Sequence, residues 1–367
     1  MTGRITQSAR FASVWIIALR ILLSACSPQA MTPTQPATPA ASPDPEPEPE
    51  ASLPAPGSSG ALVVYSGRSE ELVGPIIKVF ENETGIDVQV RYGDTAELAA
   101  TILEEGSRSP ADVYFAQDAG ALGALAQAGR LQQLADDLLS AVEPRFRSPD
   151  GLWVGLSGRA RVVVYNTDKL APTDLPDSIW GFTDPKWNGK IGWAPTNGSF
   201  QAFVTALRVI EGEDRARKWL LGVQANNPKV YERNTAIVDA VAKGEIEVGF
   251  VNHYYLFRFL KEQGDAFPAR NYFFPAGDIG NLINVAGAGI LDTSKNVEAA
   301  EAFIRFMLSA QAQTYFAEQT TEYPLVEGIP IDPRLMPLSQ IDKPNIDLSN
   351  LDDLDGTLQL LQELGIL

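Results

Sequence analysis

Two adjacent tyrosines, Tyr254 and Tyr255, are the residues of this chain whose type and spacing point most directly to chemistry. They follow a short apolar stretch, residues 248–251, that predicts a buried strand, and Asn252 stands where an N-cap residue would begin a helix. In the first turn of such a helix, both phenol oxygens can lean toward one point beyond the strand. A phenol with a pKa of about 10 gives up its proton at neutral pH only to a strongly charged, hard cation. Ferric iron is the obvious candidate.

The same pair has a simpler structural interpretation. Tandem tyrosines often pack with the ring in the core and the hydroxyl in water. Taken by themselves, Tyr254 and Tyr255 are more often packing residues than metal ligands, so the choice depends on the elements that would position them.

Composition narrows the classes of function. The chain has 367 residues, a formal net charge of -17, one cysteine and one histidine. This length fits about two domains, and the acidic balance argues against nucleic acid as a partner, because phosphate binding needs clustered lysine and arginine. One cysteine excludes an intrachain disulfide, and one histidine leaves little for acid–base catalysis. We therefore expect a protein that meets cations and is not an enzyme.

The N-terminal 60 residues predict a signal and a tether. Arg4 and Arg10 precede an apolar run at residues 11–23, which is too short to span a bilayer. Residues 1–26 therefore form the predicted signal, and its end, Leu-Ser-Ala-Cys, resembles the lipobox of bacterial lipoproteins, in which Cys26 carries the lipid. An ordinary signal peptide with an incidental cysteine is the alternative. Residues 27–60 are rich in proline and poor in bulky apolar residues, so we expect a disordered tether that holds the protein at the outer face of the cell membrane.

From residue 61 onward, strand and helix patterns alternate, which predicts an α/β fold. Strands are expected at residues 62–65, 86–92, 112–115, 153–156, 162–165, 191–193, 248–251 and 282–291. Asp94 and Asp118 are expected to cap two of the intervening helices. Such alternation predicts mostly parallel sheets flanked by helices, with ligand groups at the carboxyl ends of strands. Ser69, Gln117 and Asp118 occupy such ends.

The order of the elements predicts two lobes. The chain leaves the first lobe near residue 160 and returns near residue 285, and two crossings make a hinge. We assign residues 61–160 plus 286–340 to lobe 1 and residues 161–285 to lobe 2. Residues 341–367 form a C-terminal segment packed across the lobes.

A second candidate site lies at the start of a predicted helix. Residues 195–199, Pro-Thr-Asn-Gly-Ser, precede a helix expected to run to Ile210. A helix N-terminus that follows small polar residues can bind an anion, although many helices begin this way without a ligand. Asn234 is expected to cap a later helix at residues 235–243.

With these elements, the chain is similar to the ferric-ion-binding solute receptors of bacterial ABC transporters, which have the type II periplasmic binding protein fold. The motifs that carry this similarity are VVYSGRSEEL at residues 63–72, EEGSRSPADVYF at 104–115, LSGRARVVVYNT at 156–167, PKWNGKIGWAPTNGSF at 185–200 and NHYYLF at 252–257. The similarity covers nearly all of residues 61–330. It implies two lobes joined by a two-strand hinge, with iron bound in the cleft between them.

The resemblance also assigns roles to residues. In that family both tyrosines of the tandem pair bind Fe3+ as phenolates, and they match Tyr254 and Tyr255. Contacts to an exogenous carbonate or phosphate are implied at Arg159, Asn197, Gly198, Ser199, Asn234 and Asn252. Because Fe3+ with two phenolates keeps a formal charge of about +1, the anion would neutralise it and fill open coordination positions.

Two departures weaken the ligand set. Where several family members have a histidine and a glutamate, this chain has Ser69 and Gln117, which are weaker ligands for a hard trivalent ion. Where others have a third tyrosine, it has Phe200. The remaining positions would be filled by the anion, by water, or by Asp118 or Tyr92. His253 is not expected to be a ligand, because its equivalent in the family is not one.

The sequence therefore predicts a monomeric, lipid-anchored receptor that captures Fe3+ with an anion and delivers it to a membrane permease. An alternative keeps the fold and replaces iron by an organic anion or amine, since the ligand set is weak. A hydrolase is disfavoured because no Ser, His and Asp arrangement is readable.

Overall fold

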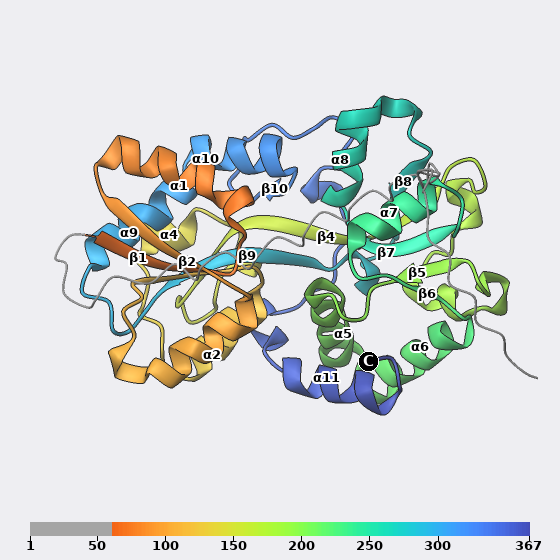
Figure 1. The fold of residues 1–367 in the computed structure, drawn as a ribbon, viewed down its shortest axis with the longest axis horizontal. Coiled ribbons are helices and arrows are strands. Elements are labelled where there is room, and N and C mark those ends of the chain that lie inside the picture. The colour runs from red at the N-terminus through yellow and green to blue at the C-terminus, as the bar shows by residue number, and fades with distance from the viewer. Residues whose placement is uncertain (1–60) are drawn as a thin grey trace, which may run out of the picture. The chain divides into compact units, whose positions relative to one another are not determined.

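The computed structural model describes residues 61–367, in which ten strands pair continuously through one long strand, β4 (Val154–Asn166) (Figure 1). Residues 1–60, with the predicted signal, tether and Cys26, lie outside the described residues. Within residues 61–367, no helix is both long enough and apolar enough to cross a membrane.

Strand β4 belongs to two sheets. The first sheet contains the N-terminal half of β4 with β1 (Ala61–Ser66), β2 (Asp87–Tyr92), β3 (Val113–Ala116), β9 (Ile283–Ile290) and β10 (Tyr323–Pro324). The second contains the C-terminal half with β5 (Ile191–Trp193), β6 (Lys229–Val230), β7 (Val248–Asn252) and β8 (Ala269–Tyr272). Figure 1 shows β1 and β2 at one end of the molecule and β5 to β7 at the other, with β4 and β9 running between them. This arrangement confirms the predicted two-lobed α/β fold.

The two strands that pass between the lobes, β4 and β9, lie side by side. In β4, the residues up to Ala160 pair with β9, and those from Arg161 onward pair with β7 and β8. The Arg161 N–H donates to the Leu282 carbonyl at 2.8 Å, just before β9 begins. The chain thus crosses near residues 160 and 283, as predicted, on two hydrogen-bonded strands that can act as a hinge. The exact lobe boundaries given above remain our proposal.

One predicted break in β4 is wrong. Residues 153–156 and 162–165 were expected to be separate strands, but β4 is continuous for 13 residues. Ser157, Gly158 and Arg159 stay extended because they pair with β10 or β9. At Gly158 an added Cβ would lie 3.2 Å from Tyr323 Cβ, so the glycine lets β10 approach closely.

The sheets are less parallel than predicted. Strands β2, β1 and β3 are parallel to one another, and so are β7, β5 and β6. The pairs made by β4 and the pair of β3 with β9 are antiparallel. The crossing strands run in opposite directions because one leaves the first lobe and the other returns to it. The antiparallel edge strand β8 was not predicted.

Helices cover both sheets. Those of the first lobe are α1 (Glu70–Thr84), α2 (Thr95–Glu105), α3 (Ala119–Gln127), α4 (Asp136–Ser140), α9 (Val297–Met307) and α10 (Ala310–Tyr315). Those of the second lobe are α5 (Gly198–Glu211), α6 (Glu213–Ala225), α7 (Asn234–Ala242) and α8 (Tyr254–Gln263). As predicted, Asp94 caps α2 and Asp118 caps α3 through their side chains. Every residue of β4 is buried, because helices or other strands cover both of its faces.

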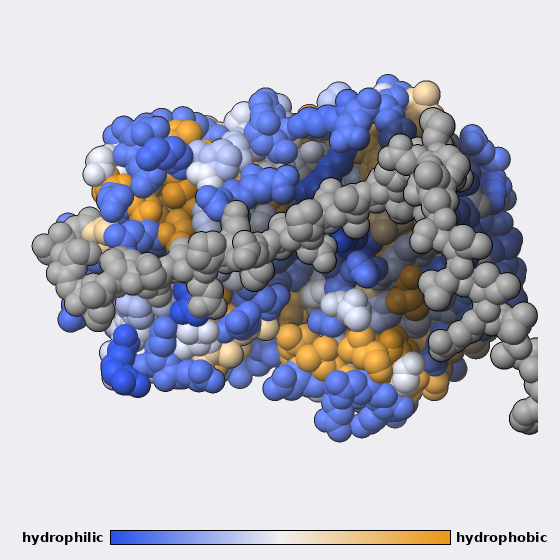
Figure 2. Space-filling view, viewed as in Figure 1, coloured by the Kyte–Doolittle hydropathy of each residue, from blue (hydrophilic) through white to orange (hydrophobic). Residues whose placement is uncertain are grey.

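The C-terminal segment contacts helices of both lobes. Helix α11 (Leu354–Glu363) packs on α5, where the Thr205 and Thr357 hydroxyls lie 2.7 Å apart. Just before α11, the Leu351 carbonyl lies so close to α3 that a Cβ at Gly120 would be 2.2 Å from its oxygen. The surface in Figure 2 is largely hydrophilic, with apolar side chains gathered near α5 and α11 and also at the other end of the view, over β1 and α1.

Candidate metal centre

Tyr254 and Tyr255 are the first two residues of α8 and directly follow β7 and His253. Their rings stack with centroids 4.3 Å apart and planes 30° apart. Tyr254 is 4% exposed, whereas Tyr255 is partly buried. Burial, followed by the neighbouring Tyr255 phenol, raises the pKa of Tyr254 above its usual range. The phenol of Tyr254 is therefore protonated at pH 7.

Arg161 is buried beside this tyrosine pair, and its hydrogen-bond partners among the described residues are neutral. Its Nη1 donates to Asn252 Oδ1 and to Ser199 Oγ, each at 3.3 Å, and its Nη2 has no partner. Among residues 61–367, no Asp or Glu forms an ion pair with it. Burial lowers the pKa of Arg161, and the nearby Tyr255 and Tyr254 act in the opposite direction. A buried cation with a free donor suits an anionic ligand.

Arg159 lies two residues earlier on β4 and so points to the same face of the strand. It is 4% exposed and donates to the Gln117 carbonyl, while its Nε has no partner. Its charge favours the ionised forms of Tyr254 and Asp118. Burial nevertheless raises the pKa of Asp118.

Except for Arg159, the predicted anion contacts come together in front of α5. Asn197 caps the helix: its Oδ1 accepts from Ser199 N at 3.2 Å, Ser199 Oγ at 2.6 Å and Asn234 Nδ2 at 3.0 Å. Asn234 Oδ1 accepts from Asn252 N at 3.1 Å. A Cβ added at Gly198 would meet no atom within 4 Å, so space is open at this helix N-terminus. Three asparagine side chains, the Ser199 hydroxyl and Arg161 are thus linked by hydrogen bonds in front of α5.

Two predicted helix caps are wrong. Asn234 is the first residue of α7 rather than its cap, and Asn252 is the last residue of β7. His253 occupies the position before α8 instead. The Asn234 side chain accepts from Asn252 N and donates to Asn197, and the Asn252 side chain accepts from Arg161. These partners from distant parts of the chain replace local capping.

The four further candidates have other partners. Ser69 is exposed at the start of α1, and Asp118 accepts from Ala121 N as the cap of α3. The Gln117 amide oxygen accepts from Arg68 Nη1 at 2.7 Å. The Tyr92 hydroxyl lies near Gly74 of α1, and burial together with Glu70 and Glu81 raises its pKa to about 12. No described contact links any of these four side chains to the tyrosine pair.

Sequence reasoning missed Arg161, although a signal was present. Alternation along a strand places residues i and i+2 on one face, so the Arg-Ala-Arg sequence at 159–161 could have predicted two arginines side by side. What the sequence could not show is that neither arginine forms an ion pair with a carboxylate of residues 61–367.

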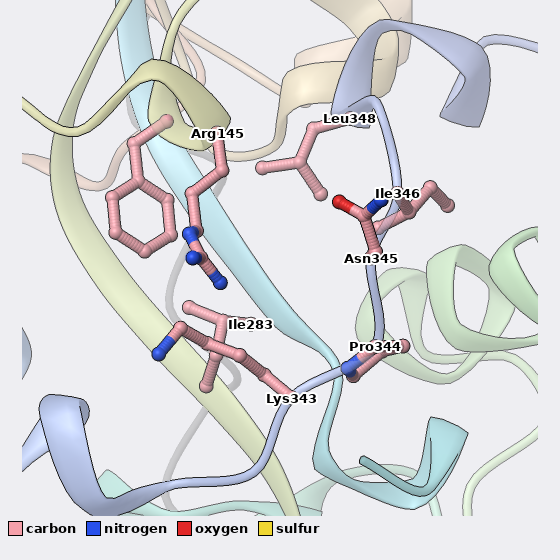
Figure 3. A pocket seen from close by; sticks show the side chains of 8 residues that line it. Arg145, Ile283, Lys343, Pro344, Asn345, Ile346 and Leu348 are labelled. Carbon is pink, nitrogen blue, oxygen red and sulfur yellow. The ribbon is translucent and has the colours of Figure 1, made fainter.

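No other described group competes as a metal site. Among residues 61–367, no three His, Cys, Asp or Glu side chains lie together as metal ligands would. The pocket in Figure 3, beside Ile283, contains Arg145 and Lys343, but Arg145 pairs with Glu143 at 3.0 Å and Lys343 donates to the Leu338 carbonyl at 3.0 Å. With a volume of about 10 Å³, this pocket has room for about one water molecule.

Comparison with known proteins places this geometry in a family. The family model of the bacterial extracellular solute-binding proteins matches residues 76–334. The major ferric iron-binding protein of Neisseria meningitidis is 34% identical over 310 residues, which are 83% of this chain and 93% of the relative. Among solved structures, iron-bound HitA from Pseudomonas aeruginosa has a TM-score of 0.77 and 36% identity, and the alignment covers 83% of this chain and 99% of that one. A Trichodesmium protein (IdiA, FutA) in complex with iron and citrate has a TM-score of 0.74 and 31% identity, with coverage of 83% and 99%.

These matches agree with the two-lobed fold and extend over nearly all of the described residues. The family consists of binding proteins of transport systems, which confirms the expectation that the chain is not an enzyme. The chain belongs to the bacterial extracellular solute-binding proteins.

Proposed function

We propose that this protein is an iron receptor that holds Fe3+ through the phenolates of Tyr254 and Tyr255. The observation that carries the proposal is the stacked tyrosine pair beside a buried arginine that lacks a carboxylate partner. The named relatives are ferric iron-binding proteins, which supports the same cargo.

We further propose that an anion completes the site in front of α5. Fe3+ with two phenolates keeps a formal charge of about +1, and the adjacent Arg161 adds another positive charge. A doubly charged anion such as carbonate or hydrogen phosphate would balance both. Gly198 leaves room for it, while Ser199, Asn197, Asn234 and Asn252 line the approach. Arg159 would contact the anion or the iron-bound phenolate of Tyr254 from the first lobe.

The protein itself supplies few strong ligands beyond the tyrosines. Because Arg68 engages the Gln117 amide oxygen and Ser69 is exposed, the remaining iron positions fall to the anion and water. A chelating carboxylate could fill more of them than carbonate, and the Trichodesmium relative holds iron with citrate. We therefore propose that carbonate, phosphate and citrate all support iron binding.

Delivery to a membrane permease and attachment through a lipid on Cys26 complete the proposed function. Hinge motion about β4 and β9 would open the site for release. A Cys26→Ser variant should move the protein from the membrane fraction to the soluble fraction of the cell, without changing iron binding by the purified protein.

The test is optical. Purified protein with ferric citrate should develop a visible phenolate-to-iron charge-transfer band. Tyr254→Phe and Tyr255→Phe should each weaken and shift this band, and the double variant should abolish it. Tyr231→Phe is the matched control, because the Tyr231 hydroxyl has no hydrogen-bond partner among the described residues. An unchanged band in either single variant would refute that residue as a ligand.

The melting temperature of the purified protein distinguishes iron from the alternative cargo. If the cargo is an organic anion or amine, the anion or amine alone will raise the melting temperature and ferric salts will add nothing. If the cargo is iron, the anion alone will have a small effect, and iron plus anion a large one.

A further inference from the structure

His253, between β7 and Tyr254, is buried with all of its polar atoms engaged. Its side chain is 0% exposed. The backbone N–H of His253 donates to the Ala160 carbonyl at 2.9 Å, and the Ala160 N–H donates to His253 Nδ1 at 3.0 Å. Nε2 lies 2.9 Å from the Thr321 carbonyl, and the His253 carbonyl accepts from Asn271 Nδ2 at 2.9 Å.

These partners define one tautomer. Nδ1 receives a hydrogen bond and therefore has no proton, whereas Nε2 faces a carbonyl oxygen and therefore carries one. A side chain with one acceptor and one donor in these directions is needed, and an apolar residue would leave the Ala160 N–H unpaired in the interior.

The position of Ala160, to which His253 is hydrogen-bonded, is informative. Ala160 stands between Arg159 and Arg161, at the point where β4 passes from one lobe to the other. His253 also packs edge-on against Tyr254, with ring centroids 5.7 Å apart. The two hydrogen bonds to Ala160 therefore set the distance between the first tyrosine of the pair and both arginines.

The other side of the imidazole is held just as firmly. Thr321 has a left-handed backbone with φ of 57°, which is unfavourable for a β-branched residue unless its surroundings fix it. The next residue, Glu322, is bonded to Arg68 at 2.9 Å and to Ser157 Oγ at 2.8 Å, with its side chain 1% exposed. Tyr323 stacks on the imidazole, with ring centroids 4.6 Å apart. The segment from Thr321 to Tyr323 thus joins His253 to the first lobe.

We propose that His253 is a positioning residue of the iron site, which holds the Tyr254 phenol at a fixed place relative to Arg159 and Arg161. This inference rests on the proposed role of Tyr254. His253 contacts neither the metal nor the anion and acts through Ala160 and Thr321.

Three substitutions separate its two hydrogen bonds. In His253→Asn, the amide oxygen can accept from Ala160 N, as Nδ1 does. In His253→Gln, the longer amide can donate to the Thr321 carbonyl, as Nε2 does. His253→Leu keeps much of the volume and neither bond. The measurements are the position and intensity of the phenolate-to-iron band, the Kd for iron by chelator competition, and the urea midpoint.

We expect His253→Leu to shift the band and to weaken iron binding about 10- to 100-fold, as loss of the groups that orient metal ligands commonly does. His253→Asn should be closest to the wild type, because it keeps the bond to Ala160, with His253→Gln between them. Tyr323→Phe, which removes only a hydroxyl bonded to the Met336 carbonyl, is the matched control and should leave band and Kd unchanged.

A residue that merely fills the core would change the urea midpoint and leave the band and Kd of every folded variant as in the wild type, and that result would overturn the proposal. If His253→Leu does not fold, the band and the Kd of His253→Asn and His253→Gln decide. If both variants have the same band and Kd as the wild type, the proposal is overturned as well. A wild-type protein without any band would instead refute the proposed function, and this inference with it.

Discussion

The cluster of Arg68, Gln117, Ser157 and Glu322 in the first lobe differs from the cluster around Arg161 in the second lobe in how its charge is balanced. In the first-lobe cluster, Arg68 and Glu322 form an ion pair at 2.9 Å, and both side chains are at most 1% exposed. Gln117 accepts from Arg68, and Ser157 donates to Glu322. Positive and negative charge are equal, and the partners are all within the protein.

The second-lobe cluster consists of Arg161, Asn197, Ser199, Asn234 and Asn252. It has similar burial and a similar number of side chains, and it also lies on β4. Its arginine has only neutral partners, and one of its terminal nitrogens has none. The space in front of Gly198 is open.

This difference in charge balance separates buried polar groups that stabilise the fold from those that we propose bind a ligand. Burial of a charge is costly unless the charge is paired. The first-lobe cluster meets this condition within the chain. Under our proposal, the second-lobe cluster meets it when an anion binds. Substitutions in the first should therefore change stability, and those in the second should change binding.

The largest effect is expected from breaking the first-lobe pair. Glu322→Leu should lower the free energy of unfolding by about 3–5 kcal/mol, because it leaves the buried Arg68 charge without a counterion. The double variant Arg68→Met/Glu322→Leu should recover most of this loss, since it removes both charges. Urea unfolding at pH 7 measures both. A double variant as unstable as the single one would show that the charge imbalance is not the cause.

The tyrosine pair beside the second-lobe cluster should release protons when iron binds. The raised pKa of Tyr254 keeps its phenol neutral at pH 7, and iron binding must remove that proton. Affinity for iron should therefore fall as the pH falls, by about tenfold per pH unit for each proton released. Competition with a chelator of known affinity at pH 6, 7 and 8 measures the slope. An affinity independent of pH in this range would exclude phenolate binding by Tyr254.

Removing the unpaired cation should affect binding more than folding. Arg161→Gln should weaken anion-supported iron binding about 10- to 100-fold, as expected for loss of a charge-assisted hydrogen bond of about 1.5–3 kcal/mol. The free energy of unfolding should change by less than about 1 kcal/mol or rise, because a buried charge without a counterion is removed. Arg130→Gln, which breaks the more exposed pair of Arg130 with Asp292, is the control and should leave iron binding unchanged. If Arg161→Gln and Arg130→Gln lose the same amount of iron affinity, the loss is not specific to the second-lobe cluster.

Sequence reasoning succeeded where the decisive contacts are local. The caps Asp94 and Asp118 could be predicted because each side chain bonds to a backbone N–H two or three residues away. The strand before the tyrosine pair could be predicted from its apolar run, whereas iron binding by the pair stays a prediction.

The failures share a physical cause. Residues 157–159 look like a turn until β10 and β9 pair with them. Asn234 and Asn252 look like caps, but the Asn234 side chain accepts from Asn252 N and the Asn252 side chain accepts from Arg161. The roles of Arg161 and His253 depend on partners more than 30 residues away or on the absence of a carboxylate. One sequence does not reveal such partners. The resemblance pointed to the asparagines and Ser199 of the second-lobe cluster, but neither Arg161 nor the hydrogen bonds of His253 could be predicted.

The smallest effect should come from filling the open space itself. Gly198→Ala adds a methyl group that meets no protein atom within 4 Å, at a position without positive φ. The variant should be as stable as the wild type or gain up to about 1 kcal/mol, because alanine loses less backbone entropy than glycine in α5. The methyl group should nevertheless weaken iron binding several-fold with carbonate or phosphate, since it occupies the space in front of the helix. In buffer depleted of both anions, the wild type and the variant should bind iron equally. If the wild type and Gly198→Ala also bind iron equally when carbonate or phosphate is present, the anion binds elsewhere. The difference between the two clusters would then matter for stability but not for iron binding.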